Sequence, residues 1–593
     1  MCGIVGIASK NKDIAVDLVC RLQRLQYRGY DSAGCALIVE NTTFVKKTIG
    51  KVGCLLNSVV ASKIESNIGI AHTRWATHGG VNLKNAHPQS FKGFFVVHNG
   101  IMENAFEIKN TLKNKGYSFC GSTDTEVMLK LAFEYAKENN CDLPHALHHL
   151  TQSLTGTFTS LFLLKSQPNR IFAIKKGSSL VIAKGKSGCI VASDIHAVHG
   201  FAKEVVHLDD NDIAVISHDG FDVFNNKKQI KKEVSLIDNL TSENTKKEHE
   251  SFMIKEILEQ PKMLRRILQN FDFDKVKNSI TTDQVSLVYI VACGSSFFAA
   301  LIAKTWIEKY WGIEAKAEIA SEFECKISTD KKLFILVSQS GETADTMCAL
   351  QKIKNNGGNT IAFVNNPHSA LARDCDFALQ TNAGVELSVA ATKTFTAQLI
   401  SFLCLILTKM QNPNPFFDAF SVLQGKIEDV ISKIQHQLDL ASEKITAKTK
   451  VLYTGKGNGY YIAKEGALKI KELCYIMTES IAAGELKHGT IALIDNSVYV
   501  VVIAPYDQFF DKIFSNIQEI ASRGGKLIIF TDRQGNAKLK KLSADIFELP
   551  DTCAITMPIV YAVAMQLFAY NVAKKQKRDI DHPRNLAKAI TVE

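Results

Sequence analysis

The sequence lacks the features that mark secreted, membrane-bound and nucleic-acid-binding proteins. It has no charged N-terminal segment followed by an apolar one, which argues against a secretory signal. Its best apolar run, Leu399–Leu407, contains Ser401 and is less than half of the ~20 residues that a helix needs to cross a bilayer. We therefore expect a cytoplasmic protein without a membrane partner.

Cysteine pairs and strong charge are also missing. The 14 cysteines are scattered and form no C-x-x-C pair, so neither a zinc ribbon nor a redox motif is predicted. The net charge of +10 is mild over 593 residues, and no basic run interleaved with aromatic residues indicates a nucleic-acid partner. We predict no metal and no cofactor, because the clustered histidines have no acidic or cysteine companion at metal-ligand spacing. These histidines are His145, His148, His149, His196 and His199.

The chain length and the mild positive charge fit two to four domains that act on small anionic substrates. The stretch Met1-Cys2-Gly3-Ile4 holds a candidate nucleophile. If Met1 is removed, Cys2 carries a thiol and an α-amine, with reference pKa values of about 8.5 and 7.7–8.0. N-terminal nucleophiles use their own amine as the activating base. The active form must therefore start at Cys2, although a cysteine at this position is by itself a weak signal.

Short strands with polar ends fill the first part of the chain, to about residue 216, and predict an α+β fold with a layered sheet sandwich. Gly69–Gly79 starts apolar and continues into Arg, Trp and two His, as expected of a strand that leaves the core for a cleft. Phe94–Val97 is a strand followed by His98-Asn99-Gly100, where Asn-Gly is also a common tight turn. Ser122–Glu126 is typical of a helix N-cap.

After a polar segment, strands and helices alternate in two similar copies. In the first copy an apolar strand ends near Gly294, and in the second a strand ends near Gly455, which indicates an internal duplication of an α/β domain with a parallel sheet. The expected domains are 2–220, a linker at 221–250, 251–425, 426–575 and a tail at 576–593.

Two hydroxyl-rich loops of the first copy form a candidate phosphate site. Cys293–Ser296 and Ser338–Thr343 each follow a strand and precede a helix, where backbone N–H groups and the helix dipole attract anions. The corresponding loop of the second copy, Ala504–Asp507, has no such hydroxyls, and Pro505 has no N–H group. The sequence therefore predicts one phosphate site per chain.

A helix over 463–476 carries Glu465, Lys469 and Glu472 on one face, and on spacing alone this pattern favours a surface salt-bridge ladder. His488 lies in a glycine-punctuated loop, and Lys588 lies in the C-terminal tail. Together with the other motifs, these residues resemble the isomerising glutamine:fructose-6-phosphate aminotransferase family over nearly the whole chain. The matching motifs are MCGI, RGYDSAG, HTRWATHG, HNG, SQSGET, ELKHG and PRNLAK.

The resemblance implies a fold and an activity. It implies an N-terminal-nucleophile (Ntn) glutaminase domain followed by two sugar-isomerase (SIS) domains, with ammonia passing from the first site to the second. The expected reaction converts fructose 6-phosphate and glutamine to glucosamine 6-phosphate and glutamate, the first step of amino-sugar (UDP-N-acetylglucosamine) synthesis. A homodimer is expected, in which His488 acts across the interface.

The resemblance also assigns roles to residues of the first domain. Cys2 would attack the glutamine amide, while Asn99 and the Gly100 N–H would form the oxyanion hole. The expected glutamine-binding residues are Arg28, Arg74, Thr77, His78 and Asp124, with Arg28 seating the Cys2 segment, and Trp75 is the expected gate of the ammonia channel.

In the second half, Lys588 would form a Schiff base with the open-chain ketose, Glu472 would move the proton between C1 and C2, and His488 would open the ring. The expected sugar-phosphate ligands are Ser295, Ser296, Ser338, Gln339, Ser340, Thr343, Val389 and Lys469.

Two departures from the family pattern, Ala391 and Thr490, leave open a paralogous enzyme that acts on another sugar phosphate. Two other classes are disfavoured. Purine-pathway or asparagine-forming amidotransferases carry phosphoribosyl or ATP domains, and the sequence has no P-loop. A non-catalytic SIS sensor would not need Cys2, Glu472 and Lys588.

Overall fold

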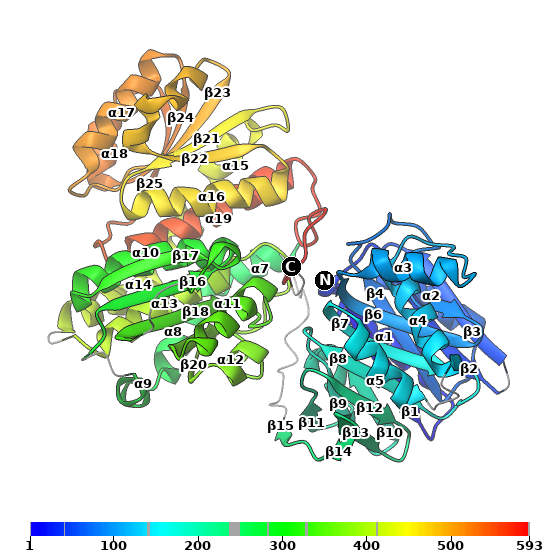
Figure 1. Ribbon diagram of the computed structural model, residues 1–593. Helices are drawn as coiled ribbons and strands as arrows, with labels where there is room; N and C mark the ends of the chain where they lie inside the picture. The colour runs from blue at the N-terminus through cyan, green and yellow to red at the C-terminus, as the bar shows by residue number, and fades with distance from the viewer. Residues whose placement is uncertain are drawn as a thin grey trace. The chain divides into compact units, whose positions relative to one another are not determined.

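The chain folds into two units (Figure 1). The computed structural model describes residues 2–40, 42–138, 143–236, 249–280, 284–325, 330–410 and 413–590. The first unit contains residues 1–243, 342–344 and 587–593, and the second contains 244–341 and 345–586. No helix among the described residues is long and apolar enough to span a bilayer.

Two antiparallel sheets form the first unit. The eight-stranded sheet has the order β15 (Val234–Leu236), β11 (Glu204–His207), β9 (Val181–Lys184), β10 (Gly188–Ala192), β1 (Gly3–Ser9), β4 (Ile68–Arg74), β2 (Ser32–Val39), β3 (Thr42–Ile49). The seven-stranded sheet has the order β14 (Lys228–Ile230), β13 (Phe221–Asn225), β12 (Asp212–Ile216), β8 (Ile171–Lys176), β7 (Gly156–Leu164), β6 (Phe94–Met102), β5 (Gln89–Phe91).

Helices cover the outer faces of both sheets, which gives the predicted layered sandwich. Strand β1 shows why: Ile4 and Ala8 pack between the two sheets, whereas Val5 and Ile7 pack against helices, because successive side chains of a strand point to opposite faces. The helices of the eight-stranded sheet are α1 (Ile14–Gln23), α2 (Val52–Ser62) and α6 (Ile195–Val198), with the 3₁₀ turn η1 (Gln26–Arg28). Those of the seven-stranded sheet are α3 (Ala105–Asn114), α4 (Asp124–Glu138) and α5 (Leu143–Ser153).

Two five-stranded parallel sheets form the second unit. The first has the order β17 (Glu314–Ile319), β16 (Leu287–Ala292), β18 (Lys332–Ser338), β19 (Asn359–Val364), β20 (Phe377–Gln380). The second has the order β22 (Thr478–Ala482), β21 (Lys450–Gly455), β23 (Val498–Ile503), β24 (Lys526–Asp532), β25 (Ala544–Leu549). The strand order is the same in both, which confirms the predicted duplication.

Helices pack around both sheets of this unit. They are α7 (Phe252–Leu258), α8 (Gln260–Asn270), α9 (Phe273–Ser279), α10 (Gly294–Trp311), α11 (Ala344–Asn355), α12 (Ala370–Asp374), α13 (Lys393–Leu407), α14 (Asn414–Lys433), α15 (Gln435–Glu443), α16 (Asn458–Cys474), α17 (Phe510–Ser522), α18 (Arg533–Leu539) and α19 (Met557–Lys575). Short 3₁₀ segments are η2 (Ala320–Glu322), η3 (Ala483–His488) and η4 (Thr490–Leu493). The apolar run noted in the sequence lies in α13, every residue of which is buried.

The strand order creates one crevice at each sheet. In an open parallel sheet, ligands bind beyond the carboxyl ends of the strands, at the point where the strand order reverses. That point lies between β16 and β18 in the first sheet and between β21 and β23 in the second. The two hydroxyl-rich loops of the sequence follow β16 and β18, so they meet at the first crevice.

Two boundaries differ from the expected ones. The predicted linker at 221–250 begins with β13, β14 and β15, which pair at the sheet edges; its Lys- and Asn-rich composition is that of exposed edge strands. Residues 237–248 of this segment lie outside the described residues. The expected boundary at 425/426 falls inside α14.

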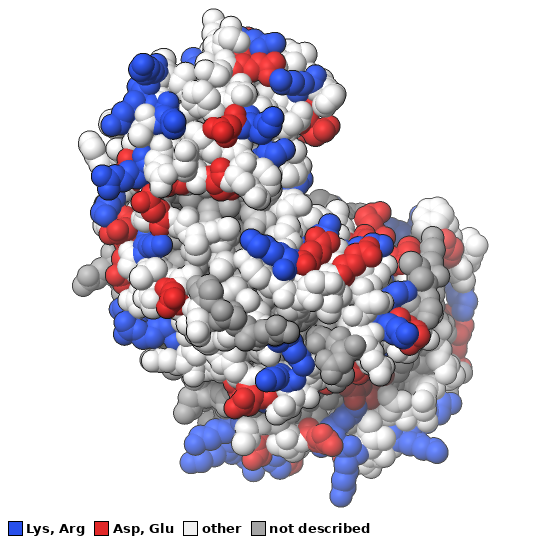
Figure 2. All heavy atoms as spheres, turned by 90° about the vertical axis from the view of Figure 1, so that its left-hand side faces the viewer, with Lys and Arg blue, Asp and Glu red and all other residues white. Residues whose placement is uncertain are grey.

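Charged side chains are mixed in sign on the face drawn in Figure 2. Basic and acidic residues are interspersed there, and neither sign covers a large continuous area of that face. This distribution agrees with the mild net charge of +10.

Candidate functional site

Cys2 lies at the start of β1, beside the end of β4. Pairing of Gly3 with Thr73 brings the Cys2 thiol to Trp75, whose N–H donates to Sγ at 3.2 Å while the thiol lies 3.5 Å from the Trp75 carbonyl oxygen. Burial raises the pKa of Cys2 above its ordinary value of 9.0, and the Trp75 N–H and the Arg74 cation oppose this effect. The thiol therefore needs a base to become a nucleophile at neutral pH.

Asn99 and Gly100 lie inside a strand. They belong to β6 and pair with Thr159 and Phe158 of β7, so the tight-turn interpretation of Asn-Gly is wrong. The Asn99 side-chain amide donates to the Cys2 carbonyl oxygen at 2.9 Å. Gly100 has φ +134°, and a Cβ atom there would lie 2.0 Å from the Thr157 carbonyl oxygen, so only glycine fits.

Arg74 and Asp124 both fix backbone near the thiol. The Arg74 guanidinium donates to the carbonyl oxygens of His78 (2.5 Å), Gly79 (2.9 Å) and Gly80 (3.3 Å), which holds the exposed loop that carries Thr77 and His78. The Asp124 carboxylate, at the start of α4, accepts the N–H groups of Met102 (3.0 Å) and Thr125 (2.9 Å).

Arg28 is connected to the Cys2 strand through one serine. Its guanidinium is 1% exposed, donates to the Ser193 carbonyl oxygen at 2.7 Å and pairs with Asp194 at 3.3 Å. The Ser193 hydroxyl in turn accepts the N–H of Ile4 at 3.0 Å. This chain of contacts gives Arg28 a physical means of seating the Cys2 segment.

A buried group of histidines behind Asn99 was not identified from the sequence as part of the site. His72 donates from Nε2 to the carbonyl oxygen of His98 at 2.9 Å and so orients the peptide group that precedes Asn99. The Thr125 hydroxyl bridges His87 Nε2 (2.7 Å) and His98 Nδ1 (3.0 Å). Burial lowers the pKa of all three histidines, that of His72 to about 3, so they are neutral at neutral pH. The sequence pattern that could have indicated them is that His72 and His98 each follow an apolar run.

On the helical face with Glu465, Lys469 and Glu472, the first two side chains are buried and Glu472 is partly buried, so the surface-ladder interpretation is wrong. Lys469 Nζ lies 2.6 Å from Glu472 Oε2, 3.4 Å from Glu465 Oε1 and 3.3 Å from Ser295 Oγ. The side chains of Glu465 and Lys469 have no exposed area. Charges without solvent cost several kcal/mol each unless they are paired, so this cluster is weak evidence for stability and points to a functional role.

Glu465 is the member of this cluster to which sequence analysis gave no role. It accepts a hydrogen bond from the Ser295 hydroxyl at 3.1 Å. Burial raises the pKa of Glu465 to about 7, although the Lys469 ammonium opposes this shift. The Glu465 carboxyl therefore changes its protonation state near neutral pH, next to a loop expected to hold sugar phosphate.

The other expected ligands of the first crevice lie on its loops. Gln398 donates to the Ser296 hydroxyl at 2.9 Å, and the Ser338 hydroxyl accepts the Gly341 N–H at 3.0 Å. Gln339, Ser340 and Thr343 follow in the same loop after β18. Val389 donates its N–H to the Asp581 carbonyl oxygen at 3.1 Å, which attaches the C-terminal segment to this region.

His488 and Lys588 have different surroundings. His488 is exposed in η3. Lys588 belongs to the first unit, where its N–H lies 3.5 Å from the Tyr27 carbonyl oxygen. Their assignment to the sugar site stays a prediction.

Comparison with known proteins identifies both kinds of domain. The model of the SIS domain matches residues 284–408 and 444–574, and the model of the glutamine amidotransferase domain matches 82–200. The chain is 40% identical over 602 residues to glutamine–fructose-6-phosphate aminotransferase [isomerizing] of Aquifex aeolicus, and 38% identical over 616 residues to that of Acinetobacter baylyi, covering all of both chains in each case.

A solved structure extends this similarity to the second unit. The C-terminal domain of glucosamine-fructose-6-phosphate aminotransferase from Francisella tularensis is 35% identical, with a TM-score of 0.54, and the match covers 57% of this chain and 99% of that one. The full-length identity, the two domain models and the shared fold all indicate the same family. The chain belongs to the isomerising glutamine–fructose-6-phosphate aminotransferase family.

Proposed function

We propose that this chain converts fructose 6-phosphate and glutamine to glucosamine 6-phosphate and glutamate. The observation that carries the proposal is the presence of two separate sites in a chain that matches these enzymes along its whole length. One unit holds a thiol beside Asn99, and the other holds a buried carboxylate–ammonium cluster at a hydroxyl-lined crevice.

In the first site, Cys2 Sγ attacks the side-chain amide carbon of glutamine. Negative charge then develops on the amide oxygen, where the Asn99 amide and the Gly100 N–H act as donors; one such donor is worth roughly 10²–10³ in rate. Ammonia leaves, and water hydrolyses the thioester to glutamate. The planar guanidinium of Arg74 suits the substrate α-carboxylate, and Asp124 suits its α-ammonium.

Ring opening by His488 would expose the ketose carbonyl in the second site. Lys588 forms a Schiff base at C2 with loss of water, and ammonia displaces the lysine to leave an imine at C2. Glu472 then removes a proton from C1 and returns it to C2, which produces the 2-amino aldose. Lys469 Nζ lies 2.6 Å from Glu472 Oε2 and so fixes the position of this carboxylate.

The test is a product assay with the full-length protein. Incubation with fructose 6-phosphate and glutamine labelled with ¹⁵N at its amide should give labelled glucosamine 6-phosphate by mass spectrometry. A parallel reaction with unlabelled glutamine and ¹⁵N-ammonium should give far less label, because Trp75 gates an internal passage. Product formed only from a different sugar phosphate would contradict the proposed substrate.

We also propose a homodimer in which His488 completes the site of the partner subunit. Mixing inactive His488→Ala and Lys588→Ala proteins should restore about a quarter of wild-type activity, because half of the dimers are mixed and each has one intact site. Two variants that stay inactive after exchange of subunits, as judged by native mass spectrometry, would place His488 and Lys588 of one chain in the same site.

A further inference from the structure

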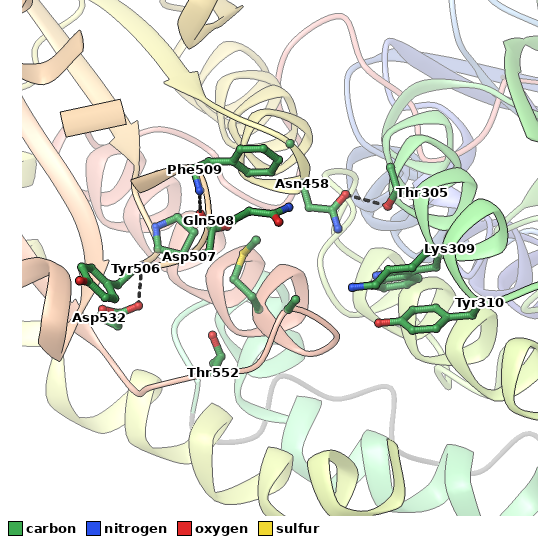
Figure 3. A pocket seen from close by; sticks show the side chains of 15 residues that line it. Thr305, Lys309, Tyr310, Asn458, Tyr506, Asp507, Gln508, Phe509, Asp532 and Thr552 are labelled. Atoms are coloured by element: carbon green, nitrogen blue, oxygen red, sulfur yellow. Dashed lines mark hydrogen bonds between the residues drawn. The ribbon is translucent and has the colours of Figure 1, made fainter. Parts of the chain in front are cut away.

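The second parallel sheet has a crevice of its own, at the position equivalent to the sugar-phosphate crevice. A cavity of about 250 Å³ lies beyond the carboxyl ends of β21, β23 and β24 (Figure 3). Its volume is below the ~300–1,000 Å³ typical of pockets for drug-sized ligands, which limits the occupant to about one ring. The loop 505–509 forms one side of the cavity, and α10 forms another.

Helices α10 and α16 contribute to both crevices of this unit. At each crevice the start of one helix meets the middle of the other. Ser295, in the first turn of α10, bonds Glu465 in the middle of α16. Thr305, in the middle of α10, donates to Asn458 Oδ1 in the first turn of α16 at 2.9 Å. The first crevice thus takes its charged cluster from α16, whereas the second takes Thr305, Lys309 and Tyr310 from α10.

A carboxylate of the protein, that of Asp532, occupies the backbone donors of the second crevice. The Asp532 carboxylate accepts the Tyr506 N–H at 2.7 Å and the Gly535 N–H at 3.0 Å. These are backbone donors of the kind that bind phosphate at strand–helix junctions. With Asp532 and Asp507 both lining the cavity and Lys309 as their only cationic counterpart in its lining, a phosphate group is repelled.

The remaining polar groups suit a sugar ring. No hydrogen bond from the described part of the chain occupies Asn458 Nδ2, Asp507 Oδ2 or the Gln508 amide, and Figure 3 shows Gln508 extending toward Asn458. Donors and acceptors that converge on a cavity fix the orientation of a polyhydroxylated ligand. The rings of Tyr310, Tyr506 and Phe509 supply the apolar faces on which such a ring can pack.

We propose that this crevice is a second ligand site that binds an unphosphorylated monosaccharide, and an amino sugar more tightly than a neutral one. The ammonium of an amino sugar can pair with Asp507, for which the lining offers two carboxylates against one lysine. This site is distinct from the sugar-phosphate crevice and does not depend on the reaction proposed there.

The test is isothermal titration of the full-length protein with glucosamine, glucose and glucosamine 6-phosphate, each with saturating fructose 6-phosphate present to occupy the first crevice. Glucosamine should bind more tightly than glucose. The phosphorylated sugar should show no binding beyond its competition at the first crevice. Asp507→Asn should weaken glucosamine binding roughly tenfold, the effect of one charge-assisted hydrogen bond, and bring it close to that of glucose.

Matched variants identify the site of binding. Asp511→Asn changes an exposed carboxylate on α17 outside the lining and should leave every affinity within twofold. Gln508→Ala should weaken both sugars. The proposal would be overturned if glucosamine binding were unchanged in Asp507→Asn and Gln508→Ala. It would also be overturned if binding were lost in Ser338→Ala, because the sugar would then occupy the first crevice. Absence of binding by both unphosphorylated sugars would overturn it as well.

Discussion

The two proposed reaction sites obtain their chemistry in opposite ways. The Cys2 thiol is surrounded by backbone groups, with Trp75 N–H at 3.2 Å, and burial raises its pKa, so its charge has to be generated during the reaction. The Glu465–Lys469–Glu472 cluster instead brings two carboxyl groups to one ammonium group, and the side chains of Glu465 and Lys469 have no exposed area. One site is activated by proton removal; the other is organised in advance by its electrostatics. The difference predicts that substitutions in one site leave the chemistry of the other intact.

The largest expected effect is that of Cys2→Ala. Removing a nucleophile typically costs several orders of magnitude, so glutamine hydrolysis should fall by roughly 10⁴-fold or more. Conversion of fructose 6-phosphate to its aldose isomer, followed by NMR, should stay within twofold because no residue of the charged cluster is altered. Loss of both activities would contradict the separation of the two sites.

Glu472→Gln tests the same separation from the other side. Loss of the base that moves the C1 proton should lower the isomerisation rate by about 10²–10⁴-fold, while glutaminase kcat stays unchanged. Glu479→Gln provides a matched control, because this carboxylate lies nearby on β22 and is exposed. An equal effect of the two substitutions would show that general loss of charge, and not the position of Glu472, is responsible.

Asn99→Ala should have a smaller effect, confined to the first site. Removal of one oxyanion donor should lower glutaminase kcat by about 10²–10³-fold with little change in KM, because the donor acts on charge that develops in the transition state. Steady-state kinetics with glutamine alone measure both constants. A rise in KM at constant kcat would instead assign Asn99 to ground-state binding.

The smallest predicted effect concerns pH. The pKa of His72 is lowered to about 3 in the fold, so the unfolded chain binds more protons between pH 3 and 6.5. Stability contributed by neutral His72 is therefore complete above pH 6.5 and falls by about 1.4 kcal/mol per pH unit below it.

Hydrogen exchange of β4 and β6 amides between pH 7 and 5, corrected for the intrinsic exchange rate, measures this loss. His72→Gln keeps an N–H donor for the His98 carbonyl oxygen but cannot titrate, so it should reduce the slope. Amides of β16 and β18 serve as the internal reference. An unchanged slope in His72→Gln would assign the acid sensitivity to other groups, among which His87 and His98 have pKa values lowered by the same burial.

The fold was predicted from the sequence to the level of its layers and its duplication. Hydrophobic periodicity is local, so it located the strands that end near Gly294 and Gly455, which are β16 and β21. It failed at Asn99-Gly100, where turn chemistry and strand pairing make the same local pattern, and only the partner strand β7 decides between them.

The sites were predicted unevenly for a similar reason. Cys2, Ser338 and Lys588 belong to distinctive motifs, but Glu465 and His72 act through groups that are distant in the sequence. Glu465 meets Ser295 across 170 residues, and spacing within one helix cannot reveal whether that helix is buried. The edge strands β13–β15 were missed because polar composition is shared by linkers and exposed strands.

The reciprocal pairing of α10 and α16 restricts how this unit can change. The two helices run antiparallel, with Ser295 opposite Glu465 and Thr305 opposite Asn458. A slip of α10 by one residue along its axis, about 1.5 Å, would break both contacts at once. Ligand preference can therefore diverge between the two crevices through the loops after β18 and β23, whereas a change in either helix alters both crevices together. For protein engineers, those loops are the place to alter one crevice without disturbing the other.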